Sequence, residues 1–103
     1  NQIDQRSCLH RKAMNAVQTG DSLEVARYCE AIPQQHVRWR WECHFKAAEA
    51  FLSRDIKYYK IAADHCLVAN EYSGRCVTIL NKIVAKLSPP ADSKSSEWKQ
   101  SLS

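Results

Sequence analysis

Glycine and proline are scarce in this chain, with two glycines and three prolines among 103 residues. They fall between segments of regular apolar spacing, which favours helices over a turn-rich β-sandwich. No apolar run approaches the roughly 18–20 residues that a transmembrane helix needs. The first six residues are polar and do not resemble a signal peptide. These shortages predict one small helical domain without a membrane span.

Sequence motifs for catalysis and for cofactor binding are also missing. The chain has no glycine-rich phosphate loop, no Cys-x-x-Cys and no His-x-x-x-His. His44 follows Cys43 and His65 precedes Cys66, but neighbouring residues on a helix point about 100° apart, so neither pair shares a metal ion by itself. The acidic residues show no arrangement beyond solvated helix faces. We therefore expect no catalytic residues, no metal and no cofactor.

The charge balance is mildly basic. Fifteen lysines and arginines stand against eleven aspartates and glutamates, for a formal charge of +4 and a pI near 8.9. No run of like charge marks a nucleic-acid-binding arm. The excess of positive charge favours a partner with an acidic surface.

Apolar residues recur with helical spacing in five segments. Gly20 ends the first segment, and Asp21 with Glu24 forms a capping-box pattern before the second. Asp55 is a candidate cap for the fourth segment, residues 70–74 are typical of a turn, and Ser88-Pro89-Pro90 ends the fifth. The residues expected to face the core are, segment by segment, Leu9, Ala13, Ala16 and Val17; Leu23, Ala26, Cys29 and Ile32; Trp41, Cys43, Phe45, Ala47, Ala48, Ala50, Phe51 and Leu52; Tyr58, Ile61, Ala62, Cys66 and Ala69; Val77, Leu80, Val84 and Leu87.

The five cysteines are regularly spaced. Cys8, Cys43 and Cys76 are 35 and 33 residues apart, and Cys29 and Cys66 are 37 apart. A period in the mid-thirties is typical of a repeat built from two helices. We therefore expect an all-α fold of five helices, forming about two and a half stacked antiparallel hairpins in residues 1–88. Residues 89–103 are expected to form a polar, flexible tail.

Two stretches of the chain can be aligned with each other. Ser7–Ala13 aligns with Glu42–Ala48, and Ala26–Cys29 aligns with Ala63–Cys66. In its period, paired amphipathic helices and small residues at helix contacts, the segment 7–87 resembles the tetratricopeptide family. The resemblance implies a right-handed array of helical hairpins that binds other macromolecules and is not an enzyme.

The cysteine positions permit two interpretations. Cys66 and Cys76 lie on either side of the turn at residues 70–74, so a disulfide can join them. Cys29 and Cys43 can pair only if the third helix begins late, near Val37. The alternative is that all of the cysteines are reduced core residues. Bridges would indicate an extracytoplasmic (periplasmic or secreted) protein, and reduced thiols a cytoplasmic one.

Cys8 has no partner by this reasoning. If the bridges form, its equivalents, Cys43 and Cys76, each pair with a cysteine from the preceding unit. We therefore expect a partner for Cys8 upstream of the given sequence, as in a fragment of a longer array.

Basic and aromatic residues alternate in the string Val37–Trp41. Tryptophan and arginine are common at the energetic centres of protein interfaces. We therefore expect a protein–protein interaction module or scaffold, with contacts at Arg38, Trp39, Arg40 and Tyr59. The alternatives are a small nucleic-acid-binding or regulatory domain, because such strings also stack on bases, and a cysteine-based redox or metal sensor.

Overall fold

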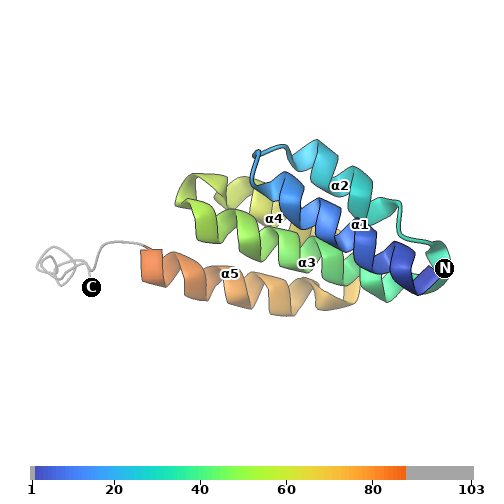
Figure 1. Ribbon diagram of the computed structural model, residues 1–103. Helices are drawn as coiled ribbons and strands as arrows, with labels where there is room; N and C mark the ends of the chain where they lie inside the picture. The colour runs from blue at the N-terminus through green and yellow to red at the C-terminus, as the bar shows by residue number, and fades with distance from the viewer. Residues whose placement is uncertain (1, 88–103) are drawn as a thin grey trace, which may run out of the picture.

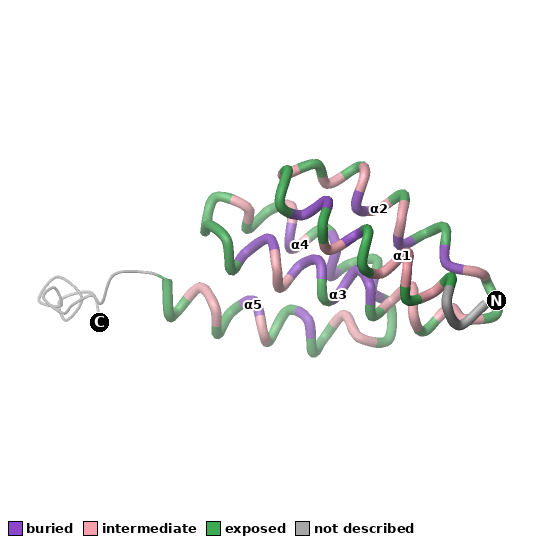
Figure 2. Tube along the Cα trace, in the orientation of Figure 1, coloured by how far each residue is buried: buried purple, intermediate pink, exposed green. Residues whose placement is uncertain are grey.

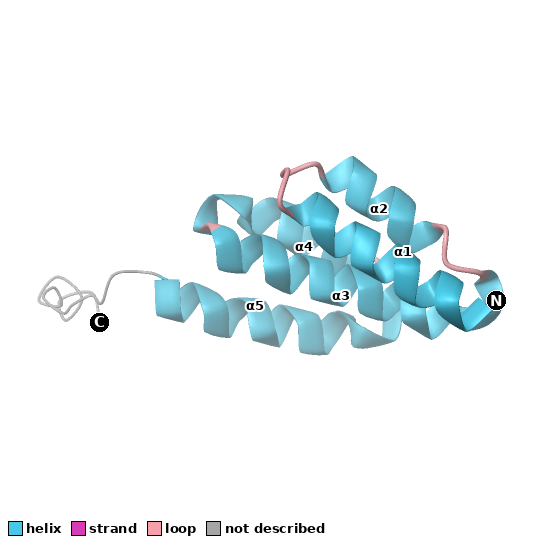
Figure 3. Ribbon diagram, viewed as in Figure 1, coloured by secondary structure: helices cyan, strands magenta, loops and turns pink. Residues whose placement is uncertain are grey.

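The computed structural model describes residues 2–87, which are helical apart from short connections (Figures 1 and 3). Within this range the five α-helices and the absence of strands confirm the predicted all-α class. One-turn 3-10 helices, Gln34–His36, Ile56–Tyr58 and Asn70–Tyr72, lead into the last three α-helices. The α-helices are α1 (Gln2–Val17), α2 (Ser22–Glu30), α3 (Val37–Arg54), α4 (Tyr59–Leu67) and α5 (Ser73–Leu87). The tail expected at 89–103 lies outside the described residues.

Helix α3 is the centre of the fold. It contacts each of the other four α-helices, and α1 and α5 lie along opposite sides of it (Figure 1). Helices α1 and α2 form one antiparallel hairpin, and α3 and α4 form a second. The broad apolar face predicted for this segment follows from its position, because a helix with neighbours on several sides needs a wide apolar stripe.

The first hairpin turns where the sequence predicted. Gly20 has a φ of 79°, a left-handed conformation that glycine adopts without strain, and it follows the end of α1. A side-chain oxygen of Asp21 accepts a hydrogen bond from the Glu24 amide at 3.1 Å and caps α2. Asp55 accepts a similar bond from the Lys57 amide at 2.9 Å, ahead of α4. Local capping therefore sets both hairpin turns.

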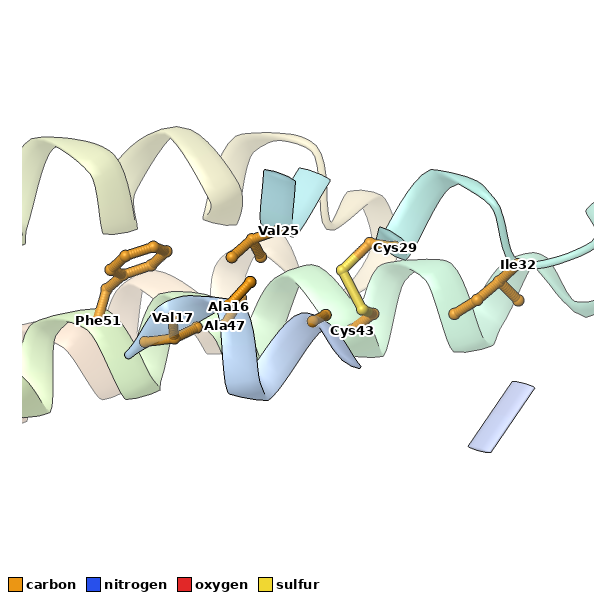
Figure 4. Close-up of a cluster of buried hydrophobic side chains, with 9 residues drawn as sticks. Ala16, Val17, Val25, Cys29, Ile32, Cys43, Ala47 and Phe51 are labelled. Carbon is orange, nitrogen blue, oxygen red and sulfur yellow. A yellow bond between two sulfur atoms is a disulfide. The ribbon is translucent and has the colours of Figure 1, made fainter. Parts of the chain in front are cut away.

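Two clusters of buried apolar side chains lie on either side of α3. Figure 2 shows buried positions along all five helices. The first joins α3 to the α1–α2 hairpin (Figure 4). The second joins α3 to α4 and α5. The first contains Ala13, Ala16, Val17, Val25, Cys29, Ile32, Cys43, Ala47 and Phe51, and the second Phe45, Ala48, Leu52, Ala62, Cys66, Ala69, Cys76 and Leu80.

Several of the predicted inward faces were wrong in detail. Leu23 is 83% exposed, and Val25 takes its place in the core of α2. Val77 and Leu87 are also exposed, because the buried Cys76 turns a different side of α5 inward. The turn expected at 70–74 is only partly correct: Asn70 has a positive φ, but α5 already begins at Ser73.

The structure contains both cysteine pairs that the sequence suggested. Cys29 and Cys43 form one disulfide, with Cα atoms 5.5 Å apart, and Cys66 and Cys76 form the other, with Cα atoms 5.4 Å apart. Helix α3 begins at Val37, which is the condition that the first pair required. Each bridge ties α2 or α4 to the helix that follows it. Cys8 is a free, partly exposed thiol.

Candidate binding groove

A groove of about 580 Å³ opens between α2 and α4, and α3 forms its floor. Its lining combines apolar side chains with a few polar and charged ones, a mixture typical of ligand-binding sites. The α2 wall carries Ser22, Leu23, Ala26 and Glu30; the floor carries Val37, Arg40, Trp41 and His44; the α4 wall carries Asp64, His65 and Val68.

Within residues 5–87, the two histidines of the groove are the only buried residues with polar side chains. His44 is 2% exposed and His65 is 4% exposed. Their Nδ1 atoms lie 2.9 Å apart, and their ring centroids are 5.2 Å apart with planes 29° from parallel. The rings therefore meet edge to edge, nitrogen against nitrogen. The Phe51 ring lies nearly parallel to His65 at 5.8 Å and supports it from the core.

The outer nitrogens of both rings bond to α2. His44 Nε2 lies 2.7 Å from a carboxylate oxygen of Glu30, and His65 Nε2 lies 3.0 Å from the hydroxyl of Ser22. A continuous chain of hydrogen bonds thus runs Ser22–His65–His44–Glu30. It joins α2 to α4, α4 to α3, and α3 back to α2.

The polarity of this chain follows from the chemistry of its ends. An ionised Glu30 only accepts, so Nε2 of a neutral His44 donates to it and His44 Nδ1 accepts. His65 Nδ1 must then donate to His44, which leaves His65 Nε2 to accept from the Ser22 hydroxyl. With both rings neutral, this is the one assignment that gives every contact a donor and an acceptor. Burial is the main reason that the pKa of His65 falls to about 4, and the neighbouring His44 lowers it further, while Asp64 opposes the change.

A serine bonded to a histidine is also the first half of a hydrolase triad. Hydrolysis further needs N–H groups directed at the oxyanion that develops on the substrate. Ser22 is the first residue of α2, and the carboxylate of Asp21 already caps that helix end. A negative charge there opposes an oxyanion, so this helix end is unsuited to stabilising the intermediate of acyl transfer.

Charges line both walls of the groove. The carboxylates of Glu30 and Asp64 are 56% and 61% exposed, whereas the side chain of Arg40 is 22% exposed. Arg40 donates to the carbonyl of Ile32 at 2.7 Å and forms an ion pair with Glu30 at 3.7 Å. The exposed charge among the lining residues is therefore acidic, although Asp64 also forms an ion pair with Lys60 at 3.6 Å and the chain as a whole is basic.

The four residues predicted as partner contacts do not share one surface. Arg40 lines the groove. Arg38 is exposed and forms an ion pair with Glu71 at 3.5 Å. Tyr59 is 44% exposed at the start of α4 and does not line the groove.

Trp39 lies on the opposite side of α3. The Arg6 guanidinium carbon stands 4.1 Å from the centre of its ring, a cation–π distance. Trp39 and Glu42 line a second hollow, of about 450 Å³, against Ser7, His10, Arg11 and Met14 of α1. Because Arg38, Trp39 and Arg40 diverge around the helix, they form no continuous platform for stacking bases.

Sequence reasoning missed the meeting of His44 and His65. It considered each histidine only with its neighbouring cysteine. The two residues lie at similar distances in sequence from Asp55, where the α3–α4 hairpin turns. The symmetry argument that paired Cys66 with Cys76 would have paired them as well.

Comparison with protein-family models, with curated proteins and with solved structures yields no match to this chain. None of the helices within residues 2–87 combines the length and the apolar character that crossing a membrane requires. The same residues include no group of three His, Cys, Asp or Glu side chains that could hold a metal ion.

Proposed function

We propose that this protein is a non-enzymatic protein-recognition module and that the groove between α2 and α4 is its binding site. The occupant is a segment of a partner protein that inserts aliphatic side chains between the two walls and carries basic residues at its flanks. The observation that carries the proposal is the exposure of Leu23 and Val68, at 83% and 51%, on opposite walls of one groove. Large apolar side chains exposed around a concavity are a mark of interaction sites.

The basic character of the partner follows from exposure. Glu30 and Asp64 present carboxylates to solvent from the two walls, while Arg40 is largely covered and bonded within the protein. Complementary charges at the rim steer association and select partners more than they add affinity. The net charge of the chain predicts a partner with an acidic surface, whereas the exposed carboxylates of this groove favour a basic partner.

Rigidity of the groove also supports a binding role. The Cys29–Cys43 bridge fixes α2 to α3, and Cys66–Cys76 fixes α4 to α5. The hydrogen-bond chain Ser22–His65–His44–Glu30 connects the two walls with the floor. A site held in its binding conformation loses less conformational entropy when a partner docks.

We propose further that α1–α2 and α3–α4 are copies of one tetratricopeptide-like hairpin unit. The supporting feature is that the second helix of each hairpin is bridged near its end to the helix that follows. Two disulfides in a domain of this size support localisation to an oxidising, extracytoplasmic compartment. Arrays of such hairpins are suited to binding because their side-by-side helices create extended concave surfaces.

Affinity measurements on designed variants test the binding site. Peptides would first be selected by display against the immobilised, oxidised protein, and one synthetic peptide would then be titrated calorimetrically. Leu23→Asp and Val68→Asp should each weaken binding by about tenfold or more, because they place a charge where the partner's apolar side chains dock. Val77→Asp is the matched control, since Val77 is an exposed valine on α5 outside the groove.

The same titration separates the groove from the surface suggested by the sequence. Trp39→Ala should leave binding within about twofold of wild type, because Trp39 lies on the α1 side of α3. If Val77→Asp weakens binding as much as Leu23→Asp, or if only Trp39→Ala does, the groove is not the site.

A further inference from the structure

The contact between the two histidine rings depends on how many protons the pair carries. The Nδ1–Nδ1 contact of 2.9 Å has room for one hydrogen. With both rings neutral, that hydrogen belongs to His65 and points at His44. If both rings are protonated, two N–H groups face each other and carry like charges in a buried site, so the contact cannot persist.

Breaking this contact affects the two ends of the α2 wall unequally. His65 bonds to Ser22 at the start of α2, whereas Cys29, near the end of α2, is covalently joined to α3. The disulfide is insensitive to protonation and keeps that end of the wall in place. Movement of the His65 ring therefore releases the end of α2 that carries Ser22 and Leu23.

We propose that the His44–His65 pair is an acid-sensitive latch that holds the groove in its binding conformation at neutral pH and releases the partner on acidification. This inference rests on the proposed function, because it concerns the regulation of the same groove. The lowered pKa of His65 agrees with it, because protonation of both rings, which breaks the contact, then requires clearly acidic conditions.

Other ionisable groups face the pair and must be separated from it. Glu30 on α2, Asp64 on α4 and Arg40 on α3 line the same groove, whereas α1 and α5 contribute no described residue to its lining. Protonation of Glu30 or Asp64 would also weaken the binding of a basic partner. A variant that lacks the latch but retains both carboxylates isolates the histidine effect.

The first experiment uses the free protein and needs no partner. NMR spectra across a titration from about pH 7.5 to pH 3.5 would follow the two histidine rings, the indole of Trp41 inside the groove and the indole of Trp39 outside it. We expect Trp41 and the amides of Ser22 and Leu23 to shift together with the histidine rings, while Trp39 does not. Titration of the rings without a response from Trp41, Ser22 and Leu23 would overturn the latch, whatever the partner is.

The second experiment uses the selected peptide and the variant His65→Gln, which cannot be protonated. Between about pH 7.5 and pH 3.5 we expect wild type to lose about threefold in affinity beyond any loss shown by His65→Gln. Equal losses in the two proteins would assign the acid effect to Glu30 and Asp64 and overturn the latch.

If His65→Gln does not fold, Ser22→Ala replaces it. Removing the bond that joins His65 to α2 should weaken peptide binding already at pH 7.5 and should reduce the acid dependence of binding. An unchanged pH profile of binding counts against the latch. Failure of the peptide to bind at any pH would instead count against the proposed function, and the NMR titration would still decide the latch.

Discussion

The Nδ1 atom of His44 lies 2.9 Å from the Nδ1 atom of His65, and both rings are almost fully buried. Two imidazoles in such contact share one proton, so the stability of this fold depends on pH in a defined direction. The pKa of His65 is lowered from 6.5 to about 4 by burial and by His44. Between these two values the unfolded chain binds a proton at this site that the folded protein does not.

Acidification should therefore destabilise the protein. Because the pKa of His65 is lower in the folded state, its neutral form contributes full stability above the unfolded pKa, and that stability is lost as the pH falls from about 7 to 4. A shift of this size corresponds to roughly 3 kcal/mol. Urea unfolding of the oxidised protein at several pH values measures the loss, and His65→Gln should flatten the curve. His10→Gln on α1 is the comparison: burial also lowers the pKa of His10, so this variant should flatten the curve only in part and keep the slope due to the histidine pair. A wild-type curve no steeper than that of His65→Gln contradicts the prediction.

Thiol titration tests the disulfides directly. In denaturant without reductant we expect one reactive thiol, Cys8, and after reduction five. Replacing Cys66 and Cys76 together by serine should lower the free energy of unfolding by roughly 2–4 kcal/mol, because the unfolded chain regains the conformations that the bridge excludes. Cys8→Ser is the control and should change stability little. Five reactive thiols before reduction would mean that the cysteines are reduced core residues.

The two glycines respond differently to substitution by alanine. Gly20→Ala should destabilise the protein by about 1 kcal/mol or more, because φ is positive there and the added methyl group would meet the Tyr58 hydroxyl at 3.1 Å. Gly74→Ala is the matched control: it lies in the first turn of α5 with no atom within 4 Å of the new methyl group. It should be neutral or stabilising by up to about 1 kcal/mol. Thermal unfolding compares the two, and equal destabilisation would show that the α1–α2 turn is not constrained as described.

Much of the fold could be predicted from the sequence because its signals are local. Apolar spacing located the five helices, and Asp21 and Asp55 marked two helix starts that the structure confirms. The prediction erred at Leu23 and Val77, which match the spacing of a buried stripe but face solvent. Spacing fixes the period of a helix, whereas the packing of its neighbours decides which side turns inward.

The candidate site was much less predictable. Its central contact joins His44 to His65, which are distant in sequence, and its walls come from helices that no local pattern places beside each other. The conspicuous Val37–Trp41 string contributes three of its residues to the groove lining, Val37, Arg40 and Trp41, because successive residues point in different directions around α3. A groove assembled from three helices becomes visible only once their packing is known.

The most direct test of the central claim is a footprint of a bound, selected peptide by backbone NMR. We predict that the largest chemical-shift changes fall on Leu23, Ala26, Trp41 and Val68, which line the groove from α2, from α3 and from the end of α4. Changes centred instead on Trp39, His10 and Met14, around the hollow between α1 and α3, would contradict it.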